Sequence, residues 1–203
     1  MDGAKHAAFI MRLIFFIVLH SFLAIPYIKE RIMRLACWSP PAYRLGYNII
    51  SLLVFGWVMS AVSHSAMLYE IPGAARYIFN LIQVIMLIAL ASCLLSTGLP
   101  SFLGIDALLA DTGSRTPQVL ATKGWYGIVR HPLYLLSIIF MFSNPVMTVR
   151  WMLLACIATL YFILGALIEE KRLQKEFGEE YGRYREQVPF ILPLPRNHTI
   201  PTR

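Results

Sequence analysis

Four long stretches of this chain contain no Asp, Glu, Lys or Arg, and they constrain the fold more than any other feature. They cover residues 45–69, 77–105, 131–149 and 151–168. A helix that crosses the hydrocarbon core of a bilayer needs about 20 mostly apolar residues. The chain is also 58% hydrophobic and only 14% charged, whereas soluble domains have about 45–50% apolar and about 25% charged residues. The sequence therefore predicts an all-α integral membrane protein.

The apolar stretches and the turn residues between them predict five transmembrane helices, over 7–28, 43–66, 77–98, 132–145 and 149–168. The fourth is short, because a helix of about 14 residues extends only about 21 Å. Asn144-Pro145 then turns the chain, so that the fourth and fifth spans form a helical hairpin. We expect one membrane domain over residues 1–203.

The segment after residue 168 is highly charged but carries one apolar stripe at helical spacing. We expect an amphipathic cytoplasmic helix that continues the fifth span or separates from it at Gly178, followed by a non-helical strap, "VPFILPLP". The stripe consists of Leu173, Phe177, Tyr181, Tyr184 and Val188.

The net charge of +7 is distributed unevenly along the chain. Most Lys and Arg residues fall in 29–44, 115–130 and 171–203, which the five predicted spans place on one side of the membrane. Because cytoplasmic loops are enriched in Lys and Arg, we expect a bacterial inner-membrane protein with its N-terminus outside and its C-terminus in the cytoplasm. This rule explains the basic charge without a nucleic-acid partner and leaves membrane lipid as the expected surroundings. The three cysteines are scattered, so no metal site is expected.

The stretch "GWYGIVRHPLY" at 124–134 places a cation and an imidazole at the start of an apolar helix. Proline is favoured at the first position of a helix, so Pro132 predicts a helix start with His131 near the N-cap. Helix N-termini bind anions, and Arg130 would strengthen such a site. The alternative is that Arg130 only reaches toward lipid phosphates.

Two carboxylates, Glu169 and Glu170, lie at the inner end of the fifth predicted span. Trp125, Tyr126 and Tyr134 lie between them and the anion site, and aromatic faces attract organic cations. The alternatives are surface ion pairs with the basic residues that follow and an aromatic belt at the membrane interface. Taken together, the groups suit a ligand with a carboxylate, an ammonium and a second cation, as in S-adenosylmethionine.

The motif at 124–134, followed by "EEKRLQKEFGEEYGRYREQVPFILP" at 169–193, resembles the signature of the isoprenylcysteine carboxyl methyltransferase superfamily. The chain looks closest to methanethiol S-methyltransferases and NnrU-like membrane proteins. The resemblance implies a small multispan enzyme that uses S-adenosylmethionine, with Arg130, His131 and Glu170 in catalytic roles. The cofactor-binding residues that it implies are Gly124, Trp125, Tyr126, Arg130, His131, Tyr134, Glu169, Glu170, Tyr181, Tyr184 and Arg185.

The resemblance implies methyl transfer to a small or lipophilic acceptor, with a thiol favoured. A prenylated cysteine carboxylate and a lipid amine are alternative acceptors. A thiol must lose its proton before it reacts, and His131 or His20 could accept it. Two other readings remain open: a sterol-type reductase that uses NADPH, and a non-enzymatic accessory protein of the NnrU-like kind.

Overall fold

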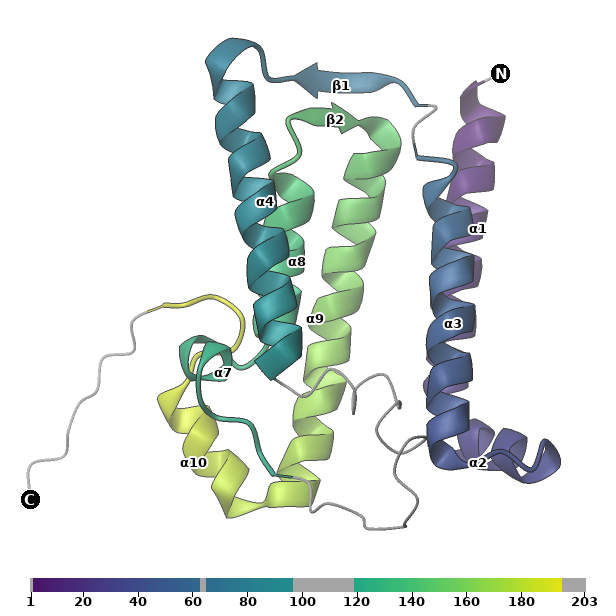
Figure 1. The fold of residues 1–203 in the computed structure, drawn as a ribbon. Coiled ribbons are helices and arrows are strands. Elements are labelled where there is room, and N and C mark those ends of the chain that lie inside the picture. Colours follow the sequence, from purple (N-terminus) through teal and green to yellow (C-terminus); the bar gives the residue numbers. More distant parts are fainter. Residues whose placement is uncertain (1, 63–64, 97–118, 195–203) are drawn as a thin grey trace, which may run out of the picture. The chain divides into compact units, whose positions relative to one another are not determined.

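The computed structural model describes residues 2–62, 65–96 and 119–194, and this part of the chain is mostly helical (Figure 1). Two compact units can be distinguished within it. The first unit contains residues 2–62, 65–70 and 146–154, and the second contains 71–96, 119–145 and 155–194. We describe each unit by itself, and the single domain expected from the sequence stays a prediction.

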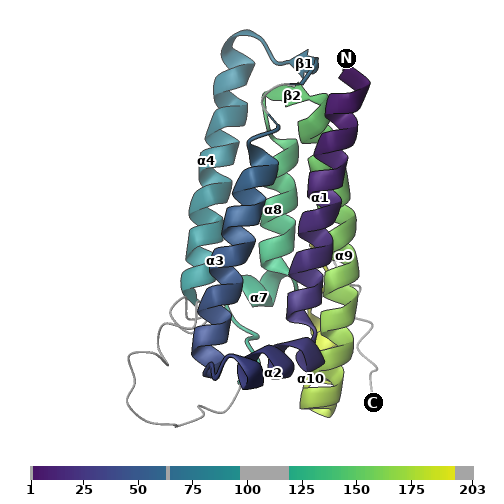
Figure 2. The same cartoon turned by 90° about the vertical axis from the view of Figure 1, so that its right-hand side faces the viewer.

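The first unit is built on two long helices that lie side by side, α1 (Asp2–Ala24) and α3 (Pro40–Met59) (Figures 1 and 2). The short helix α2 (Pro26–Leu35) connects them. The first helix ends four residues earlier than the predicted span, because a proline such as Pro26 lacks the N–H of a continuing helix and clashes with the preceding turn. Ser39 caps α3 by accepting a hydrogen bond from the Ala42 N–H at 3.4 Å.

A two-stranded antiparallel ribbon in the first unit was not predicted. It pairs β1 (Met67–Glu70) with β2 (Val146–Thr148), with Met67 opposite Thr148 and Glu70 opposite Val146. The Val149 N–H extends the pairing by donating to the Ala66 carbonyl at 3.0 Å. The helix predicted over 43–66 therefore ends at residue 59, because the following residues leave the helix to enter the ribbon.

The second unit contains α4 (Gly73–Ser96), α8 (Pro132–Phe142) and most of α9 (Val149–Phe177). In both views α4 lies beside α8 (Figures 1 and 2). The two helices bury a small cluster of Ala89, Cys93 and Leu136. Pro132 is the first residue of α8 and His131 its N-cap, as the sequence predicted.

Four helices in the described ranges are long and apolar enough to cross a membrane: α1 from Gly3, then α3, α4 and α9. The helix α8 is apolar but has only 11 residues. The expectation of a helical protein with membrane-length helices is confirmed, whereas the count of five spans and their orientation stay predictions.

The amphipathic segment adopts both arrangements that its sequence allowed. The helix α9 continues to Phe177, and Gly178 then turns the chain with a φ of +53°, in the left-handed region that glycine tolerates. The helix α10 (Glu179–Gln187) follows. The predicted apolar stripe forms a core in which Tyr181, Tyr184 and Val188 pack with Leu173 and Phe177. Residues 188–194 are not helical, as expected.

Candidate functional site

Arg130 lies between the four-residue helix α7 (Trp125–Ile128) and α8, and it is only 8% exposed. Its Nε donates to Glu170 Oε1 at 2.7 Å. Its Nη1 donates to the carbonyls of Arg185 and Val188, at 2.9 and 3.1 Å. The guanidinium therefore joins α8 to α9 and to the end of α10.

The backbone beside Arg130 binds the non-helical segment 188–194, which we call the C-terminal strap. The Arg130 N–H donates to the carbonyls of Pro189 and Phe190 at 2.9 and 3.1 Å, and the His131 N–H donates to Phe190 at 3.3 Å. The Phe190 ring lies beneath the Arg130 guanidinium, with the ring centroid 5.6 Å from Arg130 Cζ. Sequence reasoning predicted an extended strap but missed that it docks here. The proline-rich composition indicated its conformation and nothing in it indicated its partner.

The imidazole of His131 is buried between the two glutamates. Its Nε2 is 3.4 Å from Glu170 Oε1 and its Nδ1 is 3.7 Å from Glu169 Oε2. Burial lowers the pKa of His131 from its ordinary value of 6.5; the two carboxylates act against this shift and Arg130 adds to it. The net effect favours a neutral imidazole, which can accept a proton.

Three rings stack in a column at the start of α8. His131 and Tyr134 are parallel with centroids 5.6 Å apart, and Tyr134 stacks on Phe162 of α9 at 5.1 Å. Phe190 packs against His131 with the ring centroids 5.1 Å apart and the ring planes nearly perpendicular. The Tyr134 hydroxyl donates to Glu169 Oε2 at 3.4 Å. The column orients His131 toward the carboxylates.

The neighbouring carboxylates have different surroundings. The Glu170 side chain is 13% exposed and belongs to the buried pair with Arg130. The Glu169 side chain is 37% exposed, and Arg172 lies 3.8 Å from its Oε1. Glu170 therefore serves mainly to neutralise Arg130, whereas Glu169 remains accessible to a cation from outside.

Tyrosines of α10 pack back against this region. The Tyr184 hydroxyl donates to the Tyr126 carbonyl at 2.7 Å, and burial raises its pKa to about 12. Tyr181 is fully buried, and burial followed by the charge of Glu170 raises its pKa. In the described part of the chain the Tyr181 hydroxyl makes no hydrogen bond of ordinary geometry, although Glu170 lies near enough to affect it. Burial also raises the pKa of Tyr126. Tyr126, Tyr181 and Tyr184 therefore all stay protonated near neutral pH.

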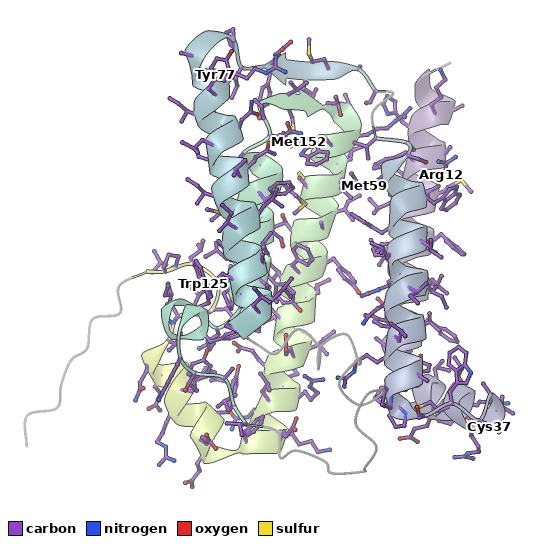
Figure 3. The ribbon with its side chains drawn as sticks, in the orientation of Figure 1. Arg12, Cys37, Met59, Tyr77, Trp125 and Met152 are labelled. Atoms are coloured by element: carbon purple, nitrogen blue, oxygen red, sulfur yellow. The ribbon has the colours of Figure 1, made fainter. Side chains whose placement is uncertain are left out.

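The remaining predicted residues position α7. Gly124 has a φ of +63°, which a side chain would strain. Trp125, marked in Figure 3, donates from its indole to Ser92 Oγ at 3.2 Å and so connects α7 with α4. Arg185 contributes its backbone carbonyl to Arg130. Every residue that the sequence singled out for the cofactor thus lies in the second unit.

His20, the alternative base, belongs to the first unit. Its Nδ1 is 3.0 Å from Ser51 Oγ and its Nε2 is 2.8 Å from the Tyr47 hydroxyl. Among the residues that the structure describes, no group of three or more His, Cys, Asp or Glu could hold a metal ion.

The second unit brings carboxylates, aromatic faces and a neutral imidazole together in one place. Such groups can bind an organic cation and accept a proton.

A match to a known protein family covers much of the segment that carries this site. The model of the phospholipid methyltransferase family matches residues 79–180, a range that includes α8, α9 and both glutamates. No solved structure matches the chain.

Similar sequences include three bacterial enzymes. The methanethiol S-methyltransferase of Crocosphaera subtropica is 38% identical over 79 residues, which are 39% of this chain and 31% of that protein. Methanethiol S-methyltransferase 1 of Bradyrhizobium diazoefficiens is 38% identical over 82 residues, or 40% of this chain and 29% of that protein. Methanethiol S-methyltransferase 2 of the same organism is 31% identical over 183 residues, covering 88% of this chain and 69% of its own length. The chain thus spans about three tenths of the length of the first two relatives, and the resemblance inferred from its motifs is confirmed.

Proposed function

Because this chain belongs to the phospholipid methyltransferase family, we propose that it is an integral membrane methyltransferase that uses S-adenosylmethionine and methylates a small or lipophilic thiol. The observation that supports this most directly is the cluster of His131, Tyr134, Glu169 and Glu170, where the start of α8 meets the C-terminal part of α9. The names of the relatives favour a thiol acceptor.

The chemistry of the cluster fits the amino-acid end and the sulfonium of this cofactor. Glu169 offers an accessible carboxylate for an ammonium group, and the aromatic face of Tyr126 suits a sulfonium. The buried Tyr181 hydroxyl, which lacks a hydrogen bond of ordinary geometry in the described part of the chain, offers a polar contact for the bound molecule. When bound, S-adenosylmethionine supplies a methyl group that its positively charged sulfur has already activated.

Arg130 has a different role from the one that its motif alone suggests. Three of its donor contacts go to Glu170 and to the carbonyls of Arg185 and Val188. We therefore assign it first as a positioning residue that holds Glu170 and the C-terminal strap. The second Nη of this guanidinium is the atom that would contact a carboxylate of the cofactor. Gly124, Trp125, Tyr184 and Arg185 support the site by positioning α7 and α10.

His131 is the preferred acceptor of the thiol proton. Its neutral imidazole is buried beside the proposed cofactor site, and the stack with Tyr134 and Phe162 keeps it in one orientation. A base is most effective when its pKa lies near the working pH, and the lowered pKa of His131 keeps it unprotonated there. His20 is the alternative base.

The proposal is tested with the full chain purified in detergent and S-adenosylmethionine carrying a labelled methyl group. Three acceptors are offered separately: methanethiol, a prenylated cysteine with a free carboxylate, and phosphatidylethanolamine. We expect label in dimethyl sulfide and little in the other products. Glu170→Gln should abolish the transfer, and Glu176→Gln, an exposed carboxylate on the same helix, should not.

Binding measurements separate the remaining readings. Calorimetry should detect S-adenosylhomocysteine at micromolar concentration and no binding of NADPH. NADPH binding with no methyl transfer would support a reductase instead. If the protein binds neither S-adenosylhomocysteine nor NADPH, and Glu170→Gln leaves its cellular phenotype unchanged, the enzyme proposal is overturned. An accessory protein is then the remaining reading.

A further inference from the structure

The helix α2 lies across the ends of α1 and α3, and in both views it runs crosswise to them (Figures 1 and 2). All three helices belong to the first unit. Since α1 and α3 are long and apolar enough to cross a bilayer, a helix across their ends runs along the membrane surface. That is the position of an interfacial amphipathic helix.

The two faces of α2 have opposite character. Ile28, Ile32 and Leu35 follow one another at spacings of four and three residues and form one apolar face. Lys29 and Arg31 border this apolar face, and Arg34 and the single acidic residue of the helix, Glu30, lie opposite it. No residue of α2 is buried within the protein, and the Leu35 side chain is 77% exposed. Ile28 and Ile32 are half-buried against the protein, so the open part of this apolar face is Leu35.

The turn that follows α2 holds a tryptophan, Trp38, whose backbone is bonded to the last turn of that helix. Cys37 has a φ of +52°, and the Trp38 N–H donates to the Met33 carbonyl at 2.9 Å. The Trp38 ring lies against the backbone of Gly46 in α3, so closely that a Cβ on Gly46 would be 2.9 Å from Trp38 Cζ3. Even so, the residue is 45% exposed. Tryptophan prefers the boundary between water and lipid, and this one is fixed there.

We propose that α2 is an interfacial helix that binds the headgroups of anionic phospholipids through Lys29, Arg31 and Arg34. Leu35 enters the acyl boundary beside Trp38. A lipid surface fits better than a protein partner, because exposed apolar side chains lie at both ends of α2: Phe22 and Ile25 before it, and Leu35 and Trp38 at and after its end. The excess of cations on α2 complements the negative surface of a bilayer that contains anionic lipid.

Native mass spectrometry of the full chain tests the proposal. The protein is released from vesicles of equal parts phosphatidylglycerol and phosphatidylcholine, and the lipids that remain bound are counted. We expect phosphatidylglycerol to be retained over phosphatidylcholine by roughly tenfold, since basic residues near an anionic surface attract anionic lipid. The variant K29Q/R31Q/R34Q should lose this preference, and the charge-conserving K29R/R31K/R34K should keep it. Free inorganic phosphate should not displace the lipid, which distinguishes a headgroup site from a phosphate site.

A second measurement reports on the position of the helix without relying on lipid retention. Cys37, labelled in Figure 3 beside α2, is exposed and can carry a fluorophore in the variant Cys93→Ala/Cys156→Ala. Quenchers attached at the headgroup level should be more effective than quenchers at the bilayer centre or in water. The proposal would be overturned if wild type and K29Q/R31Q/R34Q retained phosphatidylglycerol equally. It would also be overturned if a protein partner bound to α2 and displaced the lipid.

Discussion

Two histidines in this apolar protein sit in polar clusters of different kinds. His131 contacts two carboxylates and lies beside a buried guanidinium, and its partners come from α9 and from the C-terminal strap. His20 contacts the hydroxyls of Tyr47 and Ser51, both on the neighbouring helix α3, and stacks on Phe16 of its own helix.

The difference distinguishes a candidate catalytic site from a contact between two helices. Hydroxyl and imidazole groups commonly join transmembrane helices, and such bonds contribute little because the same groups also find partners in the unfolded state within the membrane. Buried charges are costly and usually persist because a function needs them. This contrast supports the proposed catalytic role of the cluster at His131, and helix pairing accounts for the contacts of His20 with Tyr47 and Ser51. Four predictions follow from this contrast, from the largest effect to the smallest.

Glu170→Gln should have the largest effect. It leaves the Arg130 guanidinium buried without its counter-charge, which in comparable pairs costs about 3 kcal/mol of unfolding free energy. Methyl transfer should fall at least roughly a hundredfold, because the same substitution disturbs the carboxylate beside His131. Denaturant unfolding and initial rates measure the two effects, with Glu176→Gln as the matched control. Wild-type rates in Glu170→Gln would refute the proposed site.

Arg130→Lys keeps the charge and removes the planar fork that reaches three acceptors. We expect a roughly tenfold loss of activity, since the strap is released while the pair with Glu170 is partly retained. Hydrogen exchange at the Arg130 and His131 amides should rise, because both donate to strap carbonyls. Arg183→Lys on the exposed face of α10 should change neither measurement. Slow exchange in Arg130→Lys would mean that the strap docks without the guanidinium.

The pH dependence should distinguish the two histidines. Because the pKa of folded His131 lies below 6.5, the unfolded chain binds more protons as the pH falls through that value. Stability should therefore decrease below about pH 6.5, and the rate should fall as the folded imidazole becomes protonated. His131→Asn should flatten the stability curve and remove most of the activity. A His131→Asn variant with an unchanged pH–rate profile would exclude this residue as the base.

His20→Asn should have the smallest effect. Removing the imidazole contacts to Tyr47 and Ser51 should cost about 0.6 kcal/mol, the average for hydrogen bonds between membrane helices. The rate should stay within about twofold of wild type. A variant that folds normally but transfers no methyl group would instead make His20 the base, and the contrast between the clusters would have to be reversed.

Local sequence signals predicted the elements that carry the site. Pro132 correctly marked the start of α8, and Gly178 correctly marked the break between α9 and α10. The apolar stripe that ends at Val188 correctly indicated the packing of α10. These features depend on residues within one or two turns of each other, so the sequence alone contains the relevant information.

Features made by distant segments could not be predicted in the same way. The ribbon pairs Met67 with Thr148, two short strands with no alternating pattern strong enough to indicate them. The docking of the strap depends on backbone hydrogen bonds from Arg130 and His131, and backbone groups are the same in every sequence. The motif indicated that Arg130 matters, but its many partners appear only when α9, α10 and the strap are placed around it.

The continuity of α9 has a consequence for which changes of length the chain can tolerate. Phe162, which stacks on Tyr134, and Glu169 and Glu170 lie on one unbroken helix. Successive residues of a helix differ by about 100° in direction and about 1.5 Å in height. Deleting one residue between Phe162 and Glu169 would turn both carboxylates away from His131 while leaving the ring stack in place. The separation of these residues along the chain is therefore itself a structural requirement, and a change of length there would be more damaging than most substitutions.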